Sequence, residues 1–374
     1  MPIFGTYLLK QYFKVLILSV LTFITVLVVS RLETIANFAI LGTSWSRIAL
    51  FTLYQIPYVL PLAIPISCLL SSMILFQSMS HSYELTALRS SGFSLLRIMA
   101  PLLMASAFLF LGSFYLSSEI ATTAHLKTRK MFYEFTSINP LALLQNARIA
   151  KLKESYVTME PIKNGEEAKN LLIAAKPGGQ RRLLLYMIKD LQINESQLEG
   201  REVSLLTSTS AEPFDHIIIE NQERIHVSAA DFAALLRPKG WKIANDHLKL
   251  SLLRARKAAL TAQLKKECSS AKQAKIRKDL VKNRSEIVRR FALSFATFSF
   301  TLMGICLGME ISRNRSKKGV LVAVCLAALA LISFFVAHEL DHLFWASLIL
   351  SVGPHIVIVF CSLWTLWRIQ RGIA

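Results

Sequence analysis

The sequence has 374 residues, of which 53% are hydrophobic, and it carries a formal net charge of +19. Its mean hydropathy of +0.45 is too high for a soluble domain of this length, because soluble domains mix apolar and charged residues more evenly. The composition therefore excludes an ordinary soluble protein and indicates a membrane protein.

The apolar residues gather in runs of about 18 or more, the length that crosses a ~30 Å hydrocarbon core as a helix. The first run is too long for the apolar part of a signal peptide, and no small-x-small cleavage site follows it, so we interpret it as a span. We expect six transmembrane helices, over Phe13–Ser30, Ile48–Phe76, Ile98–Leu116, Phe291–Met309, Val320–Ala337 and Leu343–Trp367. The chain then divides into 1–118 with helices 1–3, an inserted domain at 119–286, and 287–374 with helices 4–6.

Cysteine placement argues against a disulfide framework. Four cysteines, Cys68, Cys306, Cys325 and Cys361, fall inside predicted spans, and the inserted domain holds only Cys268. No Cys-x-x-Cys spacing suggests zinc.

The orientation follows from the lysines and arginines of the short connections, which favour the cytoplasm. With the N-terminus inside, the outer connections hold only Arg31 and Arg47. The inner segments hold Lys10, Lys14, Arg89, Arg97, Arg313, Arg315, Lys317, Lys318, Arg368 and Arg371. We therefore expect both termini in the cytoplasm and the inserted domain on the other side, since long domains translocate largely regardless of charge.

The inserted domain begins with short alternating or β-branched stretches separated by turn signals. The predicted strands are Ile149–Pro161, Leu171–Lys176, Leu183–Ile193, Glu202–Thr207 and His216–Glu220. The turn signals are Asn164-Gly165, Pro177-Gly178-Gly179, Glu199-Gly200 and Glu212-Pro213. This pattern predicts an all-β sandwich or open barrel.

From about Leu248 to Arg290 the sequence reads as a very basic helix that runs into the fourth span. One interpretation is a solvated helix at the membrane surface. The other is a surface that attracts anionic headgroups or an anionic amphiphile. A nucleic-acid partner is not expected on this side of the membrane.

The second span contains Pro57, Pro61 and Pro65, which share one helical face at i, i+4 and i+8. Each proline frees a carbonyl that lipid cannot satisfy, so this face is expected to meet other helices or a wet cavity. It is either a structural kink or the lining of a substrate pathway.

The connection at 80–92 predicts a short amphipathic helix at the cytoplasmic surface. Ser80 or Ser82 can cap it, Glu84 falls in its first turn, and Gly92 fits the position after its end. Leu85 and Leu88 share a face and could dock into a partner's groove, although an ordinary interfacial helix has the same pattern.

The segment His338-Glu339-Leu340-Asp341-His342 matches H-E-x-x-H, in which two histidines bind zinc and a glutamate acts as base. A third ligand is normally needed, and no Asp or Glu follows Asp341. A polar turn between two spans is the favoured interpretation, and no metal is expected here.

Two absences limit the chemistry. The chain has no G-x-x-x-x-G-K-[ST] loop, so energy from ATP has to come from a partner. The spans also lack the buried acids of an ion-coupled carrier, because Glu33, Glu84, Glu310, Glu339 and Asp341 fall at span ends or in loops.

The 3+3 spans, the inserted β domain, and the segments Tyr83–Gly92 (YELTALRSSG) and Glu286–Leu293 (EIVRRFAL) together resemble the LptF/LptG permease family. The resemblance covers essentially the whole chain. It implies one half of the lipopolysaccharide export ABC transporter of the bacterial inner membrane, with a periplasmic β-jellyroll domain.

The resemblance also implies partners and roles. Lipopolysaccharide would enter a cavity between this chain and a homologous permease and pass to a periplasmic jellyroll bridge. A cytoplasmic ABC ATPase dimer would hold the ATP and Mg²⁺, and this chain would carry no cofactor and no catalytic residue. By match to the family's coupling helix, the ATPase contacts would be Glu84, Leu85, Leu88, Arg89 and Gly92. Substrate contacts would be Arg31 and Arg47 near the outer ends of spans one and two, with Pro57, Pro61 and Pro65 lining the cavity.

Three alternatives stay open at this point. An ABC-type permease could carry another lipid or a lipoprotein. A membrane zinc protease could use His338, Glu339 and His342. A membrane-anchored β scaffold would bind no ATPase.

Overall fold

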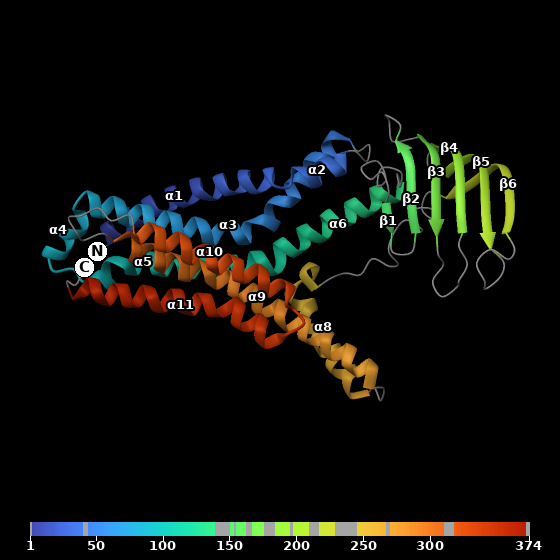
Figure 1. The fold of residues 1–374 in the computed structure, drawn as a ribbon. Helices are drawn as coiled ribbons and strands as arrows, with labels where there is room; N and C mark the ends of the chain where they lie inside the picture. Colours follow the sequence, from blue (N-terminus) through green and yellow to red (C-terminus); the bar gives the residue numbers. More distant parts are fainter. Residues whose placement is uncertain are drawn as a thin grey trace. The chain divides into compact units, whose positions relative to one another are not determined.

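The computed structural model describes residues 2–371, apart from 40–43, 139–149, 153–154, 162–166, 176–183, 195–196, 209–216, 229–244, 267–269 and 310–317. The chain forms two compact units (Figure 1). The helical unit comprises Met1–Ser30, Tyr54–Leu126 and Ala244–Ala374, and the sheet unit comprises Arg31–Leu53 and Lys127–Ile243.

Six of the described helices are long and apolar enough to cross a membrane, which confirms the predicted spans. Their elements are α1 (Pro2–Val29), α3 (Trp45–His81), α5 (Leu95–Tyr115) continued by the π-helical turn η1 (Leu116–Ile120) and α6 (Ala121–Ile138), α9 (Ser270–Gly308), α10 (Lys318–Glu339) and α11 (Phe344–Gln370). Most helix ends lie beyond the predicted ones, because backbone hydrogen bonding continues past the apolar part of a helix, whereas α1, α9 and α11 each have one end a single residue inside the predicted range.

Helix α9 is the centre of the helical unit and packs against α5, α8, α10 and α11. The apolar windows of α3 and α9 are 67% and 72% buried, whereas those of the other four spans are 11% to 28% buried. The outer helices therefore present most of their apolar side chains outward, as a membrane-embedded bundle does.

Two glycines let α9 approach α3 closely. A Cβ on Gly304 would lie against Ser72 Oγ and 2.6 Å from the carbonyl oxygen of Leu69, and one on Gly308 would lie 2.9 Å from the carbonyl oxygen of Met73. Small residues four apart are a common solution for helix packing in membranes, because the backbones can then touch.

The sheet unit contains one six-stranded antiparallel sheet with its strands in chain order. All of the predicted strand segments contain strands, which confirms the inserted β domain, although the described strands form one sheet rather than two facing sheets. The strands are β1 (Ala150–Leu152), β2 (Ser155–Pro161), β3 (Glu167–Ala175), β4 (Leu184–Asn194), β5 (Gln197–Ser208) and β6 (Ile217–Ser228).

The predicted turn at Glu199-Gly200 is wrong. Gly200 lies inside β5 and pairs with Leu191 and Ile225. A Cβ there would lie 3.3 Å from Ile188 Cγ2 and from Val203 Cγ2, so glycine relieves crowding on a packed face. The other predicted turn signals, Asn164-Gly165, Pro177-Gly178-Gly179 and Glu212-Pro213, lie outside the described residues.

One face of the sheet carries a buried apolar cluster. Leu171 and Ile188 are register partners, as are Ile188 and Val203, and all three are buried. Elsewhere on the sheet Lys189 Nζ donates to Glu202 Oε2 at 2.7 Å, which raises the pKa of the lysine. The three buried side chains Leu171, Ile188 and Val203 therefore project to the same face of the sheet.

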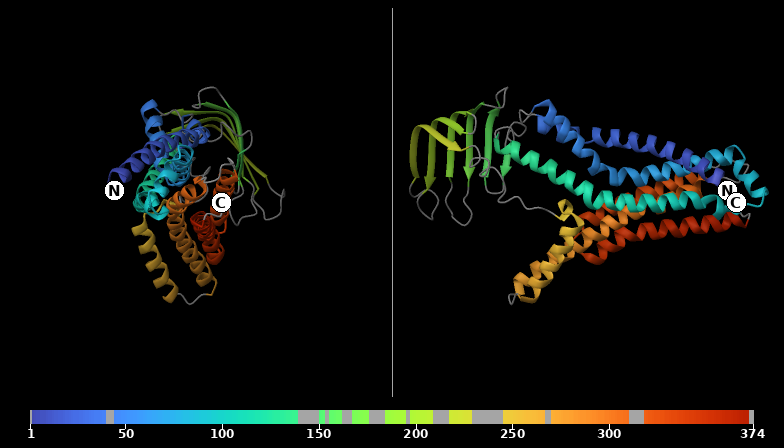
Figure 2. Two further views of the ribbon diagram at one scale, coloured as in Figure 1. Left: turned by 90° about the vertical axis from the view of Figure 1, so that its left-hand side faces the viewer. Right: turned by 180° about the vertical axis from the view of Figure 1, so that it is seen from behind.

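The basic stretch after the sheet is helical, as predicted. The 3₁₀ turn η3 (Asn245–His247) leads into α8 (Leu250–Lys266), which folds back along α9 (Figure 2). Asn283 Nδ2 on α9 donates to the carbonyl oxygen of Leu253 at 3.0 Å, and Leu253 itself is fully buried. The base of this basic hairpin is therefore fixed by buried contacts.

Candidate functional site

The short helix α4 (Glu84–Ser90) occupies the connection between α3 and α5, at the end of the helical unit where both termini lie (Figure 1). Its C-terminal turn is as predicted: Gly92 has φ 85°, its N–H donates to the Arg89 carbonyl at 3.0 Å, and the Phe93 N–H donates to the Leu88 carbonyl at 3.1 Å. This pair of bonds is a Schellman motif, which requires the left-handed conformation that glycine adopts without strain.

The predicted serine cap of α4 is wrong. Tyr83 occupies the N-cap position with φ 58° and makes no side-chain capping bond. Ser82 Oγ instead donates to the Ser78 carbonyl at 3.0 Å, which satisfies the C-terminal end of α3. The tight turn between the two helices leaves no extended residue for a cap.

The apolar face of α4 packs on its own bundle. Leu85 is only 2% exposed and belongs to the main core cluster, and Leu88 and Phe93 pack against that cluster. The exposed part of α4 includes Tyr83 and Thr86, with Glu84 and Arg89 half-buried. Leu85 thus holds α4 in place, and only the opposite face is open to a partner.

Helix α3 continues through all three of its prolines. Pro61 and Pro65 are buried and Pro57 is half-buried. The predicted proline face therefore meets protein for most of its length, and its use as a cavity lining stays a prediction.

Arg31 and Arg47 both lie in the sheet unit. Arg31 follows α1 and is half-buried, and Arg47 lies exposed in the first turn of α3. The Arg47 guanidinium carbon is 5.0 Å from the ring centroid of Phe135, whose ring meets Phe38 edge-on. Phe38 lies on α2 (Leu32–Ala39) and stacks on Phe51, so an aromatic cluster supports Arg47.

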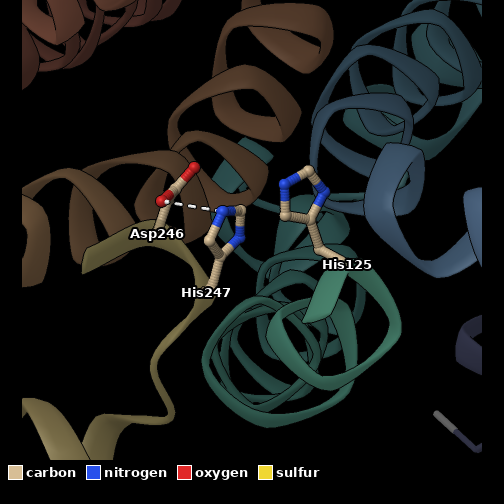
Figure 3. Close-up of side chains that lie close together, drawn as sticks. All are labelled: His125, Asp246 and His247. Carbon is tan, nitrogen blue, oxygen red and sulfur yellow. Dashed lines mark ion pairs between the residues drawn. The ribbon is translucent and has the colours of Figure 1, made fainter. Parts of the chain in front are cut away.

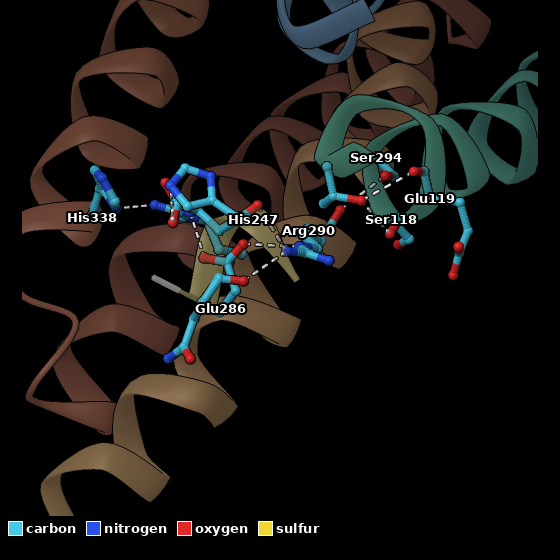
Figure 4. A network of polar contacts seen from close by, with 11 residues as sticks. Ser118, Glu119, His247, Glu286, Arg290, Ser294 and His338 are labelled. Carbon is cyan, nitrogen blue, oxygen red and sulfur yellow. Dashed lines mark hydrogen bonds and ion pairs between the residues drawn. The ribbon is translucent and has the colours of Figure 1, made fainter. Parts of the chain in front are cut away.

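A buried charged cluster on α9 lies at the other end of the helical unit, and sequence reasoning assigned it no role (Figure 4). Glu286 accepts a hydrogen bond from Arg290 Nε at 2.8 Å and another from Arg289. Arg290 Nη2 donates to the carbonyl oxygens of Asn245 and Asp246 at 3.1 and 3.3 Å. Arg290 and Glu286 are only 5% and 9% exposed, so this pair fixes η3 against α9 from within the protein.

The H-E-x-x-H segment is not assembled as a metal site in the described residues. Helix α10 ends at Glu339, so His342 lies in the following turn rather than on the same helical face as His338. His338 Nδ1 contacts Arg289, and Asp341 pairs with Lys282 at 3.1 Å. The segment acts as a polar turn, and His338, Glu339 and His342 are not brought together.

A different set of ligand-type side chains does converge, and no sequence spacing pointed to it. His125 of α6 stacks on His247 of η3 with ring centroids 4.2 Å apart, and Asp246 adjoins them (Figure 3). One nitrogen or oxygen of each residue lies within 4.8 Å of the other two. His125 and His247 are far apart in the chain, so only the fold could bring them together.

The chain matches the model of the lipopolysaccharide export system permeases LptF and LptG over residues 6–368. No curated protein sequence matches it at a significant level. The match covers nearly all of the chain, including both helix groups and the inserted sheet. The chain therefore belongs to the LptF/LptG family of lipopolysaccharide export permeases.

Proposed function

We propose that the chain extracts lipopolysaccharide from the inner membrane together with a homologous permease, driven by ATP hydrolysis on a separate ABC ATPase dimer. Family membership makes the chain an inner-membrane permease subunit of lipopolysaccharide export, without a catalytic role of its own. ATP and Mg²⁺ belong to the ATPase, and this chain binds no cofactor for transport.

The coupling proposal is supported by the way in which α4 is attached to the helical bundle. A helix that transmits force has to be attached firmly on one face and open on the other. Leu85 is buried in the bundle and the Schellman turn fixes the C-terminal end of α4, while Tyr83 and Thr86 stay exposed. Glu84 lies in the first turn beside them, where a carboxylate can pair with a cation of the ATPase.

The proposed orientation places α4 and both termini in the cytoplasm and the six-stranded sheet in the periplasm. Arg89, in the last turn of α4, and Arg368, near the C-terminus, support the first assignment. The sheet would then receive the glycolipid and pass it to a periplasmic jellyroll bridge. Its strands also present exposed apolar side chains, Met187 and Ile219, which suit acyl chains.

The test is Glu84→Ala in the full complex, reconstituted with its partner permease and ATPase. The variant should assemble normally but lose lipopolysaccharide transfer at least about 10-fold, as expected when a central interface contact is removed. ATP hydrolysis should continue without coupling to transfer. Glu33→Ala on α2 removes the same charge from an exposed position outside α4 and should transfer lipopolysaccharide normally.

Normal transfer by Glu84→Ala would overturn the coupling role of α4. Mass spectrometry of the lipids that copurify with the complex tests the cargo separately. A lipoprotein or another lipid in place of lipopolysaccharide would overturn the cargo assignment.

A further inference from the structure

We propose that His125, Asp246 and His247 form a Zn²⁺ site that ties the 3₁₀ turn η3 to helix α6 (Figure 3). Both elements belong to the helical unit. Each residue offers one ligand atom, and these atoms lie within 4.8 Å of one another. The site lies where the chain re-enters the helical unit after the sheet.

The spacing is close to that of a metal site. Two ligands at 2.0–2.1 Å from a tetrahedral zinc lie about 3.4 Å apart. His247 Nε2 and Asp246 Oδ1 are 3.6 Å apart, which is too long for a good hydrogen bond but near that separation. These two ligands therefore need little movement to share an ion.

The third ligand, His125, has to reorient. His125 is half-buried on α6, and its ring lies between those of Tyr58 and His247, with centroid distances of 4.5 and 4.2 Å. Stacked rings point their nitrogens side by side, so a shared ion requires the His125 ring to rotate out of the stack. Rotation about the two side-chain torsions of histidine leaves the backbone of α6 in place.

The environment favours a cation. Asn245 Oδ1 and Asp246 Oδ1 are buried, and neither accepts a hydrogen bond from any residue that the structure describes. Buried acceptors normally have a hydrogen-bond donor, an ordered water or a cation, and a cation beside Asp246 would satisfy these two oxygens. Arg290 satisfies the main-chain carbonyls of these residues, and Glu286 offsets its charge. The arginine thus positions η3 without neutralising the Asp246 carboxylate.

The donor set selects the metal. Two imidazole nitrogens and one carboxylate oxygen suit Zn²⁺, whereas Mg²⁺ and Ca²⁺ prefer oxygen ligands alone. Three protein ligands leave a fourth position, which water would take. The ion would link His125 and His247, which lie 122 positions apart in the chain.

The test uses the full-length chain with a non-histidine affinity tag in detergent, stripped with a chelator and then dialysed against Zn²⁺. We expect about one bound zinc per chain by elemental analysis, with no comparable binding of Mg²⁺. His125→Ala and His247→Ala should each weaken zinc binding at least about 100-fold in competition with a chromophoric chelator, since even outer-shell changes cost up to that much. His125→Gln serves as a second variant if the alanine variant does not elute as a folded protein.

The matched controls are His338→Ala and His342→Ala, which remove histidines from the H-E-x-x-H segment at the same end of the helical unit. These variants should bind zinc as the unmodified chain does. Zinc should also raise the unfolding temperature of the unmodified chain and of both controls, but not of His125→Ala or His247→Ala. The proposal is overturned if the unmodified chain binds well under one zinc, or if zinc binding survives loss of His125 and His247.

Discussion

Different interactions hold a short segment in place at each end of the helical unit. At the α4 end, a buried leucine and a backbone capping motif attach a short helix through Leu85 and Gly92. At the η3 end, a buried ion pair between Glu286 and Arg290 holds a loop through its carbonyl groups. Apolar attachment tolerates small movements, whereas a buried ion pair loses its stabilisation when its geometry changes. We therefore expect the α4 end to keep its contacts through small movements and the η3 end to be rigid.

The largest effect is expected at the η3 end, from Arg290→Ala. The substitution leaves Glu286 buried without its main partner and removes two hydrogen bonds to η3, which should lower the free energy of unfolding by about 3–5 kcal/mol. Thermal unfolding in detergent measures the loss. Arg284→Ala removes an exposed arginine from the same helix and should change little.

The double variant Glu286→Leu/Arg290→Met sharpens this prediction. It removes both charges together, so it should be markedly more stable than Arg290→Ala. If the double variant is no better than the single one, the buried pair is not the element that holds η3.

The next effect is expected at the α4 end, from Leu85→Ala. Truncating a fully buried leucine costs about 2–5 kcal/mol, so α4 should detach locally and its amides should exchange with solvent roughly 30-fold faster or more. Hydrogen exchange followed by mass spectrometry reads this out for residues 84–90. Leu96→Ala truncates an exposed leucine on α5 and should leave α4 protected.

The smallest effect is expected from Gly92→Ala, which tests the capping motif alone. Among the described residues, apart from the chain neighbours, no atom lies within 4 Å of the added methyl group, so the left-handed backbone at φ 85° is what opposes the change. The cost should be about 1 kcal/mol, seen as modestly faster exchange across α4. Gly5→Ala in helix α1 is the control, because its Cβ would make only an ordinary 3.8 Å contact with Pro101 Cβ. Equal effects of the two substitutions would contradict the role of the left-handed turn.

The same comparison explains what the sequence could predict. The α4 end is encoded locally: Gly92 follows the helix that it ends, and Leu85 and Leu88 follow the helical period, so the helix and its C-terminal cap were predicted. The N-terminal end of α4 was predicted wrongly, with a serine cap. The turn from α3 instead places Tyr83 in a left-handed conformation, which a tyrosine in the sequence does not predict. The six spans were predicted because each is a continuous apolar run.

The η3 end is encoded by residues that are distant in the chain. Glu286 and Arg290 are four apart and could be paired from the sequence, but their link to Asn245 and Asp246 depends on the fold. His125 and His247 meet only because α6 and η3 pack together. In contrast, the H-E-x-x-H spacing at 338–342 had a local signal, yet the helix ends too early to use it.

The most direct test of the central claim is ATP-driven lipopolysaccharide transfer by the reconstituted complex of this chain, its partner permease and its ATPase. Proteoliposomes loaded with lipopolysaccharide should release it to a soluble periplasmic bridge protein only with ATP, and the release should stop with Leu85→Ala but persist with Leu96→Ala. Release that is independent of ATP, or that is unaffected when α4 is detached, would contradict the account.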